Sequence, residues 1–235
     1  MISNLIMKKN KYSLKIMTNQ SSKFEETLKP TFFMDYEHPL IQEKAKELIE
    51  GIPEDDDIGK AVKLFYFVRD QIRYSVRNAR ESYNKENWKS SLTLETGFAF
   101  CIPKSILLAS LARAVGIPSR LHYVDIVNHM TSERLKKDMG SNIFIFHGFV
   151  ELFLDGRWVE ANCAFDKELC LRKNFPAVDF DGKRDGLFAA TNKDGKPFVE
   201  YIKDRGVYND APHQEVMQTW AEEYPGRYKN NGKPV

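Results

Sequence analysis

The sequence predicts one α+β domain, with helices in the first half of the chain and antiparallel strands in the second. Apolar residues recur three and four apart in the first half, which is the spacing of an amphipathic helix. Later, two strand-like runs, residues 143–154 and 157–165, are joined by Asp155 and Gly156, a pair typical of two-residue hairpin turns. No internal repeat divides the chain, and its 235 residues, 42% of them hydrophobic, are enough to form a core.

The first thirty residues lack sustained periodicity, so we predict a flexible tail over residues 1–30 and a single domain over residues 31–235. The apolar stretch 1–7 is interrupted by Lys8, which is too early for a secretory signal of about 7–15 apolar residues. No apolar run approaches the roughly 20 residues that a membrane span requires. We therefore expect a cytoplasmic protein that does not enter a membrane.

Two amphipathic helices are predicted at the start of the domain. Pro39 suits the first turn of one helix, and Gly51 is typical of the position just after its end. The acidic residues 55–57 favour the start of a second helix, whose apolar side chains recur on one face from Ile58 to Ile72. That face should belong to the core.

A long polar loop, residues 74–95, follows these helices, with Trp88 as its large apolar anchor. Residues 101–115 then leave so little polar surface that the helix they form should be buried on most sides. A strand over residues 120–127 should follow that helix in the chain.

The rest of the chain is predicted to hold fewer regular elements. Residues 131–139, stopped by Gly140, form a short exposed helix before the hairpin. After Cys170 the pattern weakens into loops, with one further amphipathic helix over residues 213–224.

The charge balance disfavours nucleic acid and anionic membranes as partners, because 35 Lys and Arg nearly cancel 33 Asp and Glu. Three cysteines do not make a disulfide framework and fit a reducing compartment. No pair of Cys or His shows zinc-site spacing, and we interpret His122 and His129 as polar loop residues. We expect no metal and no cofactor.

Cys101 stands at the entrance of the buried helix, and Pro103 is tolerated there only because it falls in the first turn. The positive end of the helix dipole and Lys104, one turn along, would both favour thiolate over thiol. The sequence therefore predicts an activated cysteine, and the alternative is a small buried hydrophobe.

The hairpin offers a partner for this thiol. If Asp155 and Gly156 form a two-residue turn, counting back places His147 opposite residue 164, with Asn162 and Asp166 as its diagonal neighbours on the same face. An imidazole beside an amide or a carboxylate is what a catalytic base requires, because a third group must hold its ring and tautomer.

Two segments resemble a known family. GFAFCIPKSILLASLARAVGIPSR is similar to the nucleophile helix of transglutaminase-like proteins, and FHGFVELFLDGRWVEANCAFD is similar to their histidine strand and hairpin. The resemblance covers roughly residues 61–170 and implies a papain-like core, a Cys-bearing helix packed against an antiparallel sheet. It implies Cys101 as nucleophile, His147 as general base and acid, and position 162 as the orienting residue.

The sequence departs from this family at the third position, where Asn162 replaces the usual Asp. An amide oxygen can still accept from the imidazole, as in Cys-His-Asn sites, and Asp166 remains the alternative third member. We expect thiol-dependent acyl chemistry on a peptide, protein or small amide, with hydrolysis of the cysteine protease or amidase kind favoured. Acyl transfer, and a non-catalytic binding module that keeps the fold, are the alternatives.

Overall fold

The computed structural model describes residues 24–76, 79, 81–224, 228–229 and 233–234. The helical half comprises α2 (Pro39–Leu48), α3 (Asp57–Gln71), β1 (Arg73–Tyr74), the 3₁₀ helix η2 (Lys85–Trp88), α4 (Ser90–Thr96), β2 (Phe98–Ala99) and α5 (Cys101–Ala114). The second half comprises β3 (Ser119–Asn128), α6 (Glu133–Met139), β4 (Ile143–Leu154), β5 (Arg157–Ala161), α7 (Lys167–Lys173), β6 (Val199–Tyr208), α8 (His213–Glu223), β7 (Tyr228–Lys229) and β8 (Lys233–Pro234).

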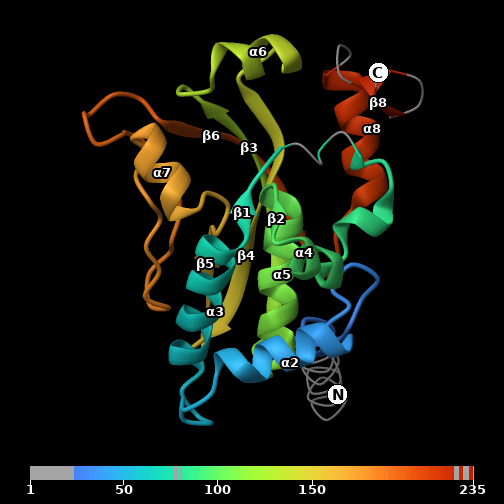
Figure 1. The fold of residues 1–235 in the computed structure, drawn as a ribbon, viewed down its shortest axis with the longest axis vertical. Coiled ribbons are helices and arrows are strands. Elements are labelled where there is room, and N and C mark those ends of the chain that lie inside the picture. Colours follow the sequence, from blue (N-terminus) through green and yellow to red (C-terminus); the bar gives the residue numbers. More distant parts are fainter. Residues whose placement is uncertain (1–23, 77–78, 80, 225–227, 230–232, 235) are drawn as a thin grey trace, which may run out of the picture.

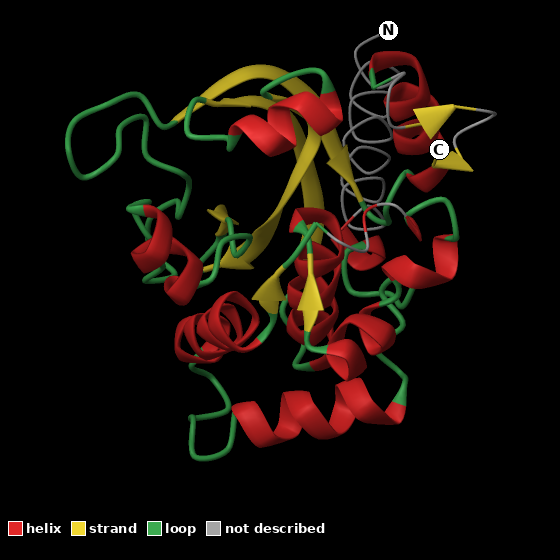
Figure 2. Cartoon of the chain, turned by 45° about the horizontal axis from the view of Figure 1, so that its top comes forward, coloured by secondary structure: helices red, strands yellow, loops and turns green. Residues whose placement is uncertain are grey.

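The predicted α+β fold is confirmed. Figures 1 and 2 show helices α2 to α5 gathered together, with the long strands β3 and β4 running from this cluster toward α6. Helices α7 and α8 lie on opposite sides of these strands (Figure 1). The Cys-bearing helix α5 packs on β3 and β4, as the resemblance implied.

At the predicted helix starts, side chains accept hydrogen bonds from backbone N–H groups that have no partner within the helix. Asp56 accepts a hydrogen bond from the Gly59 N–H at 2.8 Å, which caps α3. His38 caps α2 in the same way, and Pro39 occupies the first helical position. The apolar stripe of α3 is buried as predicted, including Phe65 and Val68.

Helix α5 is buried along its length, as its sequence predicted. Lys104 is fully buried within it, and its ammonium donates to the carbonyls of Arg69 at 2.9 Å and Ile72 at 2.5 Å. These carbonyls lie at the end of α3, where the last carbonyl groups of a helix have no N–H donor within the helix. Lys104 therefore supplies hydrogen-bond donors to the last carbonyls of α3. Burial lowers the pKa of Lys104 to about 8.

The main sheet has the strand order β5-β4-β3-β6, with every neighbouring pair antiparallel. Leu154 pairs with Arg157, so the predicted two-residue turn and register are confirmed. Asp155 and Gly156 have φ of 49° and 79°, the left-handed values that such a turn requires. The ladder ends at Val150 and Ala161, so β4 has no β5 partner over its first half.

A β-bulge interrupts the β3–β4 ladder next to His147. Val124 pairs with His147 but Ile126 pairs with Phe144, so two residues of β4 lie opposite Asp125 alone. Phe146 has a φ of 59°, which is unfavourable for a side chain with a Cβ. Asp125 accepts from the Phe146 N–H at 3.1 Å and pairs with Arg205 of β6 at 2.7 Å, which holds the bulge.

Several sequence predictions need correction. Residues 74–95 are not one loop, because η2 and α4 form within them around the buried Trp88. The second hairpin strand ends at Ala161, and α7 and β6 were not predicted. His122 lies inside β3 rather than in a loop, whereas His129 directly follows that strand.

Residues 24–29 contact the domain. Phe24 packs edge-on against Phe153, with ring centroids 4.8 Å apart, and the Thr27 carbonyl accepts from the Ser119 N–H at 3.0 Å. The predicted tail lies mostly in residues 1–23, outside the described residues, and the boundary at residue 30 stays a prediction.

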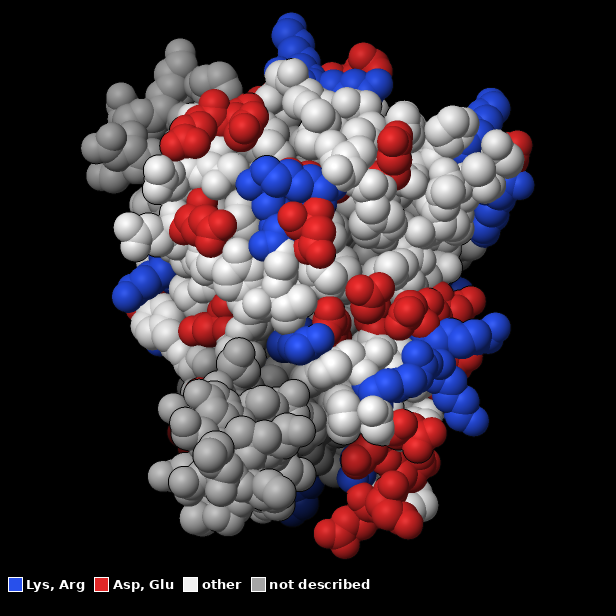
Figure 3. All heavy atoms as spheres, turned by 180° about the vertical axis from the view of Figure 1, so that it is seen from behind, with Lys and Arg blue, Asp and Glu red and all other residues white. Residues whose placement is uncertain are grey.

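Among the described residues, no helix has the length and apolar character needed to cross a membrane. Figure 3 shows the back of the molecule, where basic and acidic side chains are scattered among other residues and one acidic group stands at the lower right. No continuous field of one sign covers this face.

We predict that Lys104→Met lowers the free energy of unfolding by about 1–3 kcal/mol, because it leaves buried carbonyls at the end of α3 without a donor. Urea unfolding followed by circular dichroism measures the change. Lys63→Met is the matched control, because Lys63 is exposed and lies in α3, the helix whose last carbonyls Lys104 binds. Equal effects of the two substitutions would contradict this role for Lys104.

Candidate active site

The first turn of α5 touches β4 at Gly148. The backbone of Gly148 lies close enough to the Cys101 sulfur to lower the pKa of the thiol against the larger effect of burial. A Cβ at position 148 would lie 3.0 Å from the Tyr123 ring and 3.6 Å from the Ile102 Cα. Only glycine fits this position without movement, and it allows the thiol to lie directly against the strand that carries His147.

His147 is held by Asn162, the residue that follows β5. The His147 Nε2 and the Asn162 Nδ2 are 3.0 Å apart, while the Asn162 Oδ1 accepts from the Ala164 N–H at 3.2 Å. All three side chains of the implied triad are at least nine-tenths buried, with Cys101 8%, His147 3% and Asn162 1% exposed. With Nε2 facing the amide, Nδ1 is the ring nitrogen left to exchange a proton with the thiol.

The predicted cross-strand pair between His147 and Ala164 does not form, because the β4–β5 ladder ends before it. Asn162 nevertheless reaches the imidazole across the open edge of β4. The aromatic ring of Phe188 packs on His147 with centroids 5.2 Å apart. The Tyr201 hydroxyl accepts from the Phe188 N–H at 3.0 Å. Burial raises the pKa of Tyr201 to about 12 against a smaller lowering effect of the Asn162 side chain, so Tyr201 of β6 lies beside the amide.

Asp166 has different partners. One carboxylate oxygen accepts from the Leu169 N–H at 2.7 Å and caps α7, and the other accepts from the Tyr74 N–H at 2.8 Å. These bonds tie β1 to the start of α7. Of the two candidates for the third residue, the structure therefore brings Asn162, and not Asp166, to His147.

Burial determines the charge state of the thiol and the imidazole. It raises the pKa of Cys101 to about 11, against a smaller lowering effect of the backbone N–H groups of Gly148 and Ile102. It also lowers the pKa of His147 to about 4, against a smaller raising effect of Asn162. Both groups are therefore neutral at pH 7 in this conformation.

The expected activation of Cys101 by Lys104 is wrong. The Lys104 ammonium is directed to the end of α3, as its bonds to the carbonyls of Arg69 and Ile72 show, and burial has the largest effect on the pKa of Cys101. The expected depressed thiol pKa is wrong as well, because loss of solvation exceeds the effect of the helix N-terminus.

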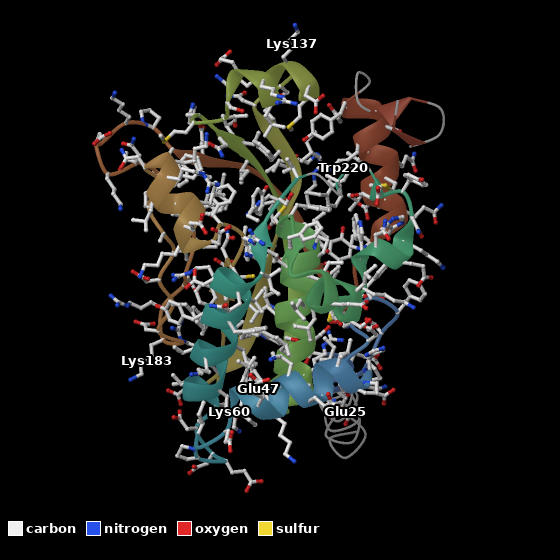
Figure 4. The ribbon with its side chains drawn as sticks, viewed as in Figure 1. Glu25, Glu47, Lys60, Lys137, Lys183 and Trp220 are labelled. Atoms are coloured by element: carbon white, nitrogen blue, oxygen red, sulfur yellow. The ribbon has the colours of Figure 1, made fainter. Side chains whose placement is uncertain are left out.

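Cys101 and His147 line one small pocket of about 50 Å³. Its other walls are mainly apolar or aromatic and include Phe100, Met139, Phe144, Ile145, Trp220 and Tyr224. Figure 4 shows Trp220 projecting from α8 toward the body of the molecule. A volume of this size admits a few water molecules or a narrow apolar group.

Helix α8 supports this pocket through the unpaired edge of β4. The Trp220 indole N–H donates to the Ile145 carbonyl at 2.8 Å. The Tyr224 hydroxyl accepts from the Ile145 N–H at 2.7 Å and donates to the Ile143 carbonyl at 2.9 Å. Two aromatic side chains thus replace a neighbouring strand and form a wall of the pocket at the same time.

The family model of the transglutaminase-like superfamily matches residues 44–163, just over half of the chain. The chain belongs to the transglutaminase-like superfamily. The matched region includes Cys101, His147 and Asn162 and ends before Asp166. At the level of the superfamily, membership indicates thiol-dependent catalysis.

Among solved structures, the chain is similar to a putative cysteine protease from Cytophaga hutchinsonii, at 13% sequence identity and a TM-score of 0.46. The match covers 79% of this chain and 54% of that one, so this chain spans about half of that protein's length. The search of curated proteins found no match.

Sequence reasoning missed most of the groups that surround the thiol and the imidazole. Phe188 and Tyr201 come from segments without a clear pattern, and the bulge at Phe146 has no local sequence signal. The role of Asp166 did have one, because an acidic residue directly before a helical segment is a typical N-cap.

We predict that iodoacetamide alkylates Cys101 before Cys163 and Cys170, because Cys101 alone of the three lines the pocket, while the others are 0% and 2% exposed. The raised pKa of Cys101 makes its reaction at pH 7 much slower than that of the same residue in the urea-unfolded chain. Peptide mass spectrometry over time measures both rates. A folded-state rate above the unfolded-state rate would show that the thiol is ionised.

Proposed function

We propose that this protein is a cysteine hydrolase that cleaves an amide or peptide bond, with Cys101 as nucleophile, His147 as general base and acid, and Asn162 as the residue that positions the imidazole. The observation that carries the proposal is the joint placement of Cys101 and His147 in one pocket, with the His147 Nε2 held 3.0 Å from the Asn162 amide.

The neutral pair favours proton transfer at the moment of attack rather than a resting thiolate. His147 Nδ1 takes the thiol proton as the sulfur bonds to the substrate carbonyl carbon, and the carbonyl oxygen becomes an oxyanion. Collapse breaks the C–N bond, and the amine leaves with the proton from His147. Water then attacks the thioester, gives one proton to His147, and releases the acid while the proton returns to the sulfur.

Asn162 can serve both forms of the imidazole because an amide has a donor end and an acceptor end. In the structure the Nδ2 faces the ring and the Oδ1 faces the Ala164 N–H. A base at Nδ1 requires a proton on Nε2, and a half-turn of the amide would present Oδ1 to that proton. A carboxylate could only accept, so it would not support the tautomer with Nε2 unprotonated.

Backbone N–H groups near the nucleophile are candidates for stabilising the oxyanion. The backbone N–H groups of Cys101, Ile102 and Gly148 lie close enough to the sulfur to lower the Cys101 pKa against the larger effect of burial. Those of Cys101 and Ile102 belong to the first turn of α5, which has no intrahelical acceptor for them. We assign the Cys101 N–H as one oxyanion donor, and the Gly148 N–H as a second donor from β4.

The pocket favours a substrate with a narrow apolar acyl group. Its aromatic walls offer little to a charged side chain, and its volume of about 50 Å³ favours a small group over a bulky one. Water fits beside the thioester, so hydrolysis needs no further acceptor site. Acyl transfer would need an amine to occupy the same space.

Short p-nitrophenyl esters of increasing acyl length test the reaction directly. We predict that the wild-type protein forms a thioester on Cys101 and releases the acid, whereas Cys101→Ser forms no thioester and His147→Ala forms it at least roughly a hundredfold more slowly. Mass spectrometry detects the acyl-enzyme, and nitrophenol absorbance reports turnover. Added glycinamide should not divert the acyl group if hydrolysis is the reaction.

Three outcomes would change the proposal. Formation of glycinamide adducts in preference to acid would indicate acyl transfer. Equal reaction of wild type and His147→Ala would remove His147 from the reaction. Failure to acylate Cys101 with every ester, in a folded protein, would favour a binding module.

The pH dependence of turnover tests the third residue. Because the pKa of His147 is lowered to about 4, its neutral form is present above that pH, so the rate should fall only as the pH approaches 4. Asn162→Asp places a carboxylate beside the imidazole, which raises the His147 pKa and moves the acid limb to higher pH. Asn162→Ala should lower the rate without such a shift.

Asp166→Asn is the matched control for that experiment, since an amide caps a helix about as well as a carboxylate. We expect its acid limb and rate to stay close to those of the wild type. If Asp166→Asn lost most of its turnover while both Asn162 variants kept theirs, Asp166 would be the residue that positions the imidazole.

A further inference from the structure

A second cluster of chemically active side chains lies on the face of the sheet that does not pack on α5. Tyr123 lies against Gly148 on the face that packs on α5. Since side chains alternate along a strand, His122 of β3 points to the opposite face. Glu151 of β4 and Glu160 of β5, which are cross-strand partners, join it there.

These three side chains bring one nitrogen and two oxygens together. The His122 Nδ1 lies 2.8 Å from a Glu151 oxygen and 3.4 Å from a Glu160 oxygen. All three atoms lie within 4.8 Å of one another. The side chains are 13%, 7% and 27% exposed, so the cluster is sheltered but open on the Glu160 side.

The Nδ1 atom faces two carboxylate groups. It is fully buried and lies 2.8 Å from a Glu151 oxygen, but the angles of this contact are not those of a regular hydrogen bond. Burial opposes a charge on the ring, and the neighbouring carboxylates favour it more strongly. The arrangement therefore holds a positive species among the three atoms, either a proton on the ring or a metal ion.

The surrounding contacts orient the ligands as they do in metal sites. The other ring nitrogen, Nε2, faces the Asp204 carboxylate at 3.1 Å, and Asp204 is fixed by the Gly206 N–H at 2.7 Å. A histidine that binds a metal almost always donates its second N–H to such a group. Arg120 pairs with the Glu151 Oε2 at 2.6 Å, which leaves Oε1 for the cluster.

We propose that His122, Glu151 and Glu160 bind a divalent first-row transition metal, Zn²⁺ being the preferred ion. One imidazole nitrogen and two carboxylate oxygens, completed by water, suit Zn²⁺, whereas Ca²⁺ and Mg²⁺ favour all-oxygen sets. The ion would tie β3, β4 and β5 together on the face opposite Cys101. Its role is structural, and it does not depend on the proposed hydrolase reaction.

Sequence spacing predicted no metal site, and the reason is now clear. The three ligands come from separate strands and are brought together only by the register of the sheet. A search for closely spaced Cys and His pairs does not detect such a set.

Zinc titration of a Cys101→Ser variant tests the proposal, because this variant removes the pocket thiol as a competing ligand. Calorimetry and metal analysis after dialysis should give one equivalent, and Zn²⁺ should raise the melting temperature. Co²⁺ should give visible bands without thiolate charge transfer. No saturable binding would overturn the proposal and leave a proton as the positive species.

Variants in the same background locate the ion. His122→Gln and Glu160→Gln should each weaken zinc binding by roughly tenfold or more, and Asp204→Asn by about 10–100-fold through the orientation of the ring. His129→Gln is the matched control, since His129 is a half-exposed histidine whose Nε2 lies 3.5 Å from Glu200. Equal affinity in all four variants would show an adventitious ion only. Since Glu160 is partly exposed, its variant should fold even if His122→Gln does not.

Discussion

The burial of α5 is the constraint on which the site depends. A helix that is apolar on all sides must be covered on all sides, and α2, α3, α4 and the sheet cover it. Its first residue is Cys101, so covering the helix brings the thiol against β4, and Gly148 allows the contact. The same burial removes water from the thiol, which is why its pKa rises to about 11 even though it stands at a helix N-terminus.

The position of His147 depends on an irregularity in β4. The bulge places Phe146 in a left-handed conformation, whose free-energy cost is of order 1–3 kcal/mol. Asp125 offsets this cost by accepting the Phe146 N–H, and the Arg205 guanidinium holds Asp125 and lies 4.9 Å from the Phe146 ring. The side chains of Trp220 and Tyr224 hydrogen-bond the backbone carbonyl and N–H of Ile145. Three separate elements, β3, β6 and α8, thus fix the backbone that precedes the imidazole.

Local patterns explain which parts of this molecule could be predicted. Helices α2, α3, α5 and α8 follow from their periodicity and end signals, and the hairpin register follows from Asp155 and Gly156. That register placed both Asn162 and Asp166 near His147, and the resemblance to the family singled out position 162. Strand β6 has mostly exposed side chains, so no alternation marked it. The bulge, the direction of Lys104 and the low solvation of Cys101 all arise from contacts between distant segments, which local reasoning does not include.

The neutral third residue fits the neutral resting pair. In a site this buried, an imidazolium beside an amide would lack a compensating carboxylate, and an isolated thiolate would lack water. The two charges are therefore formed most readily together, one proton transfer apart, when their mutual attraction replaces lost solvation. An Asp at position 162 would stabilise the imidazolium before substrate arrives and would itself be buried at 1% exposure. Asn162 avoids that buried charge and still fixes the ring, so in the proposed reaction the site becomes charged only when a carbonyl is present to receive the sulfur.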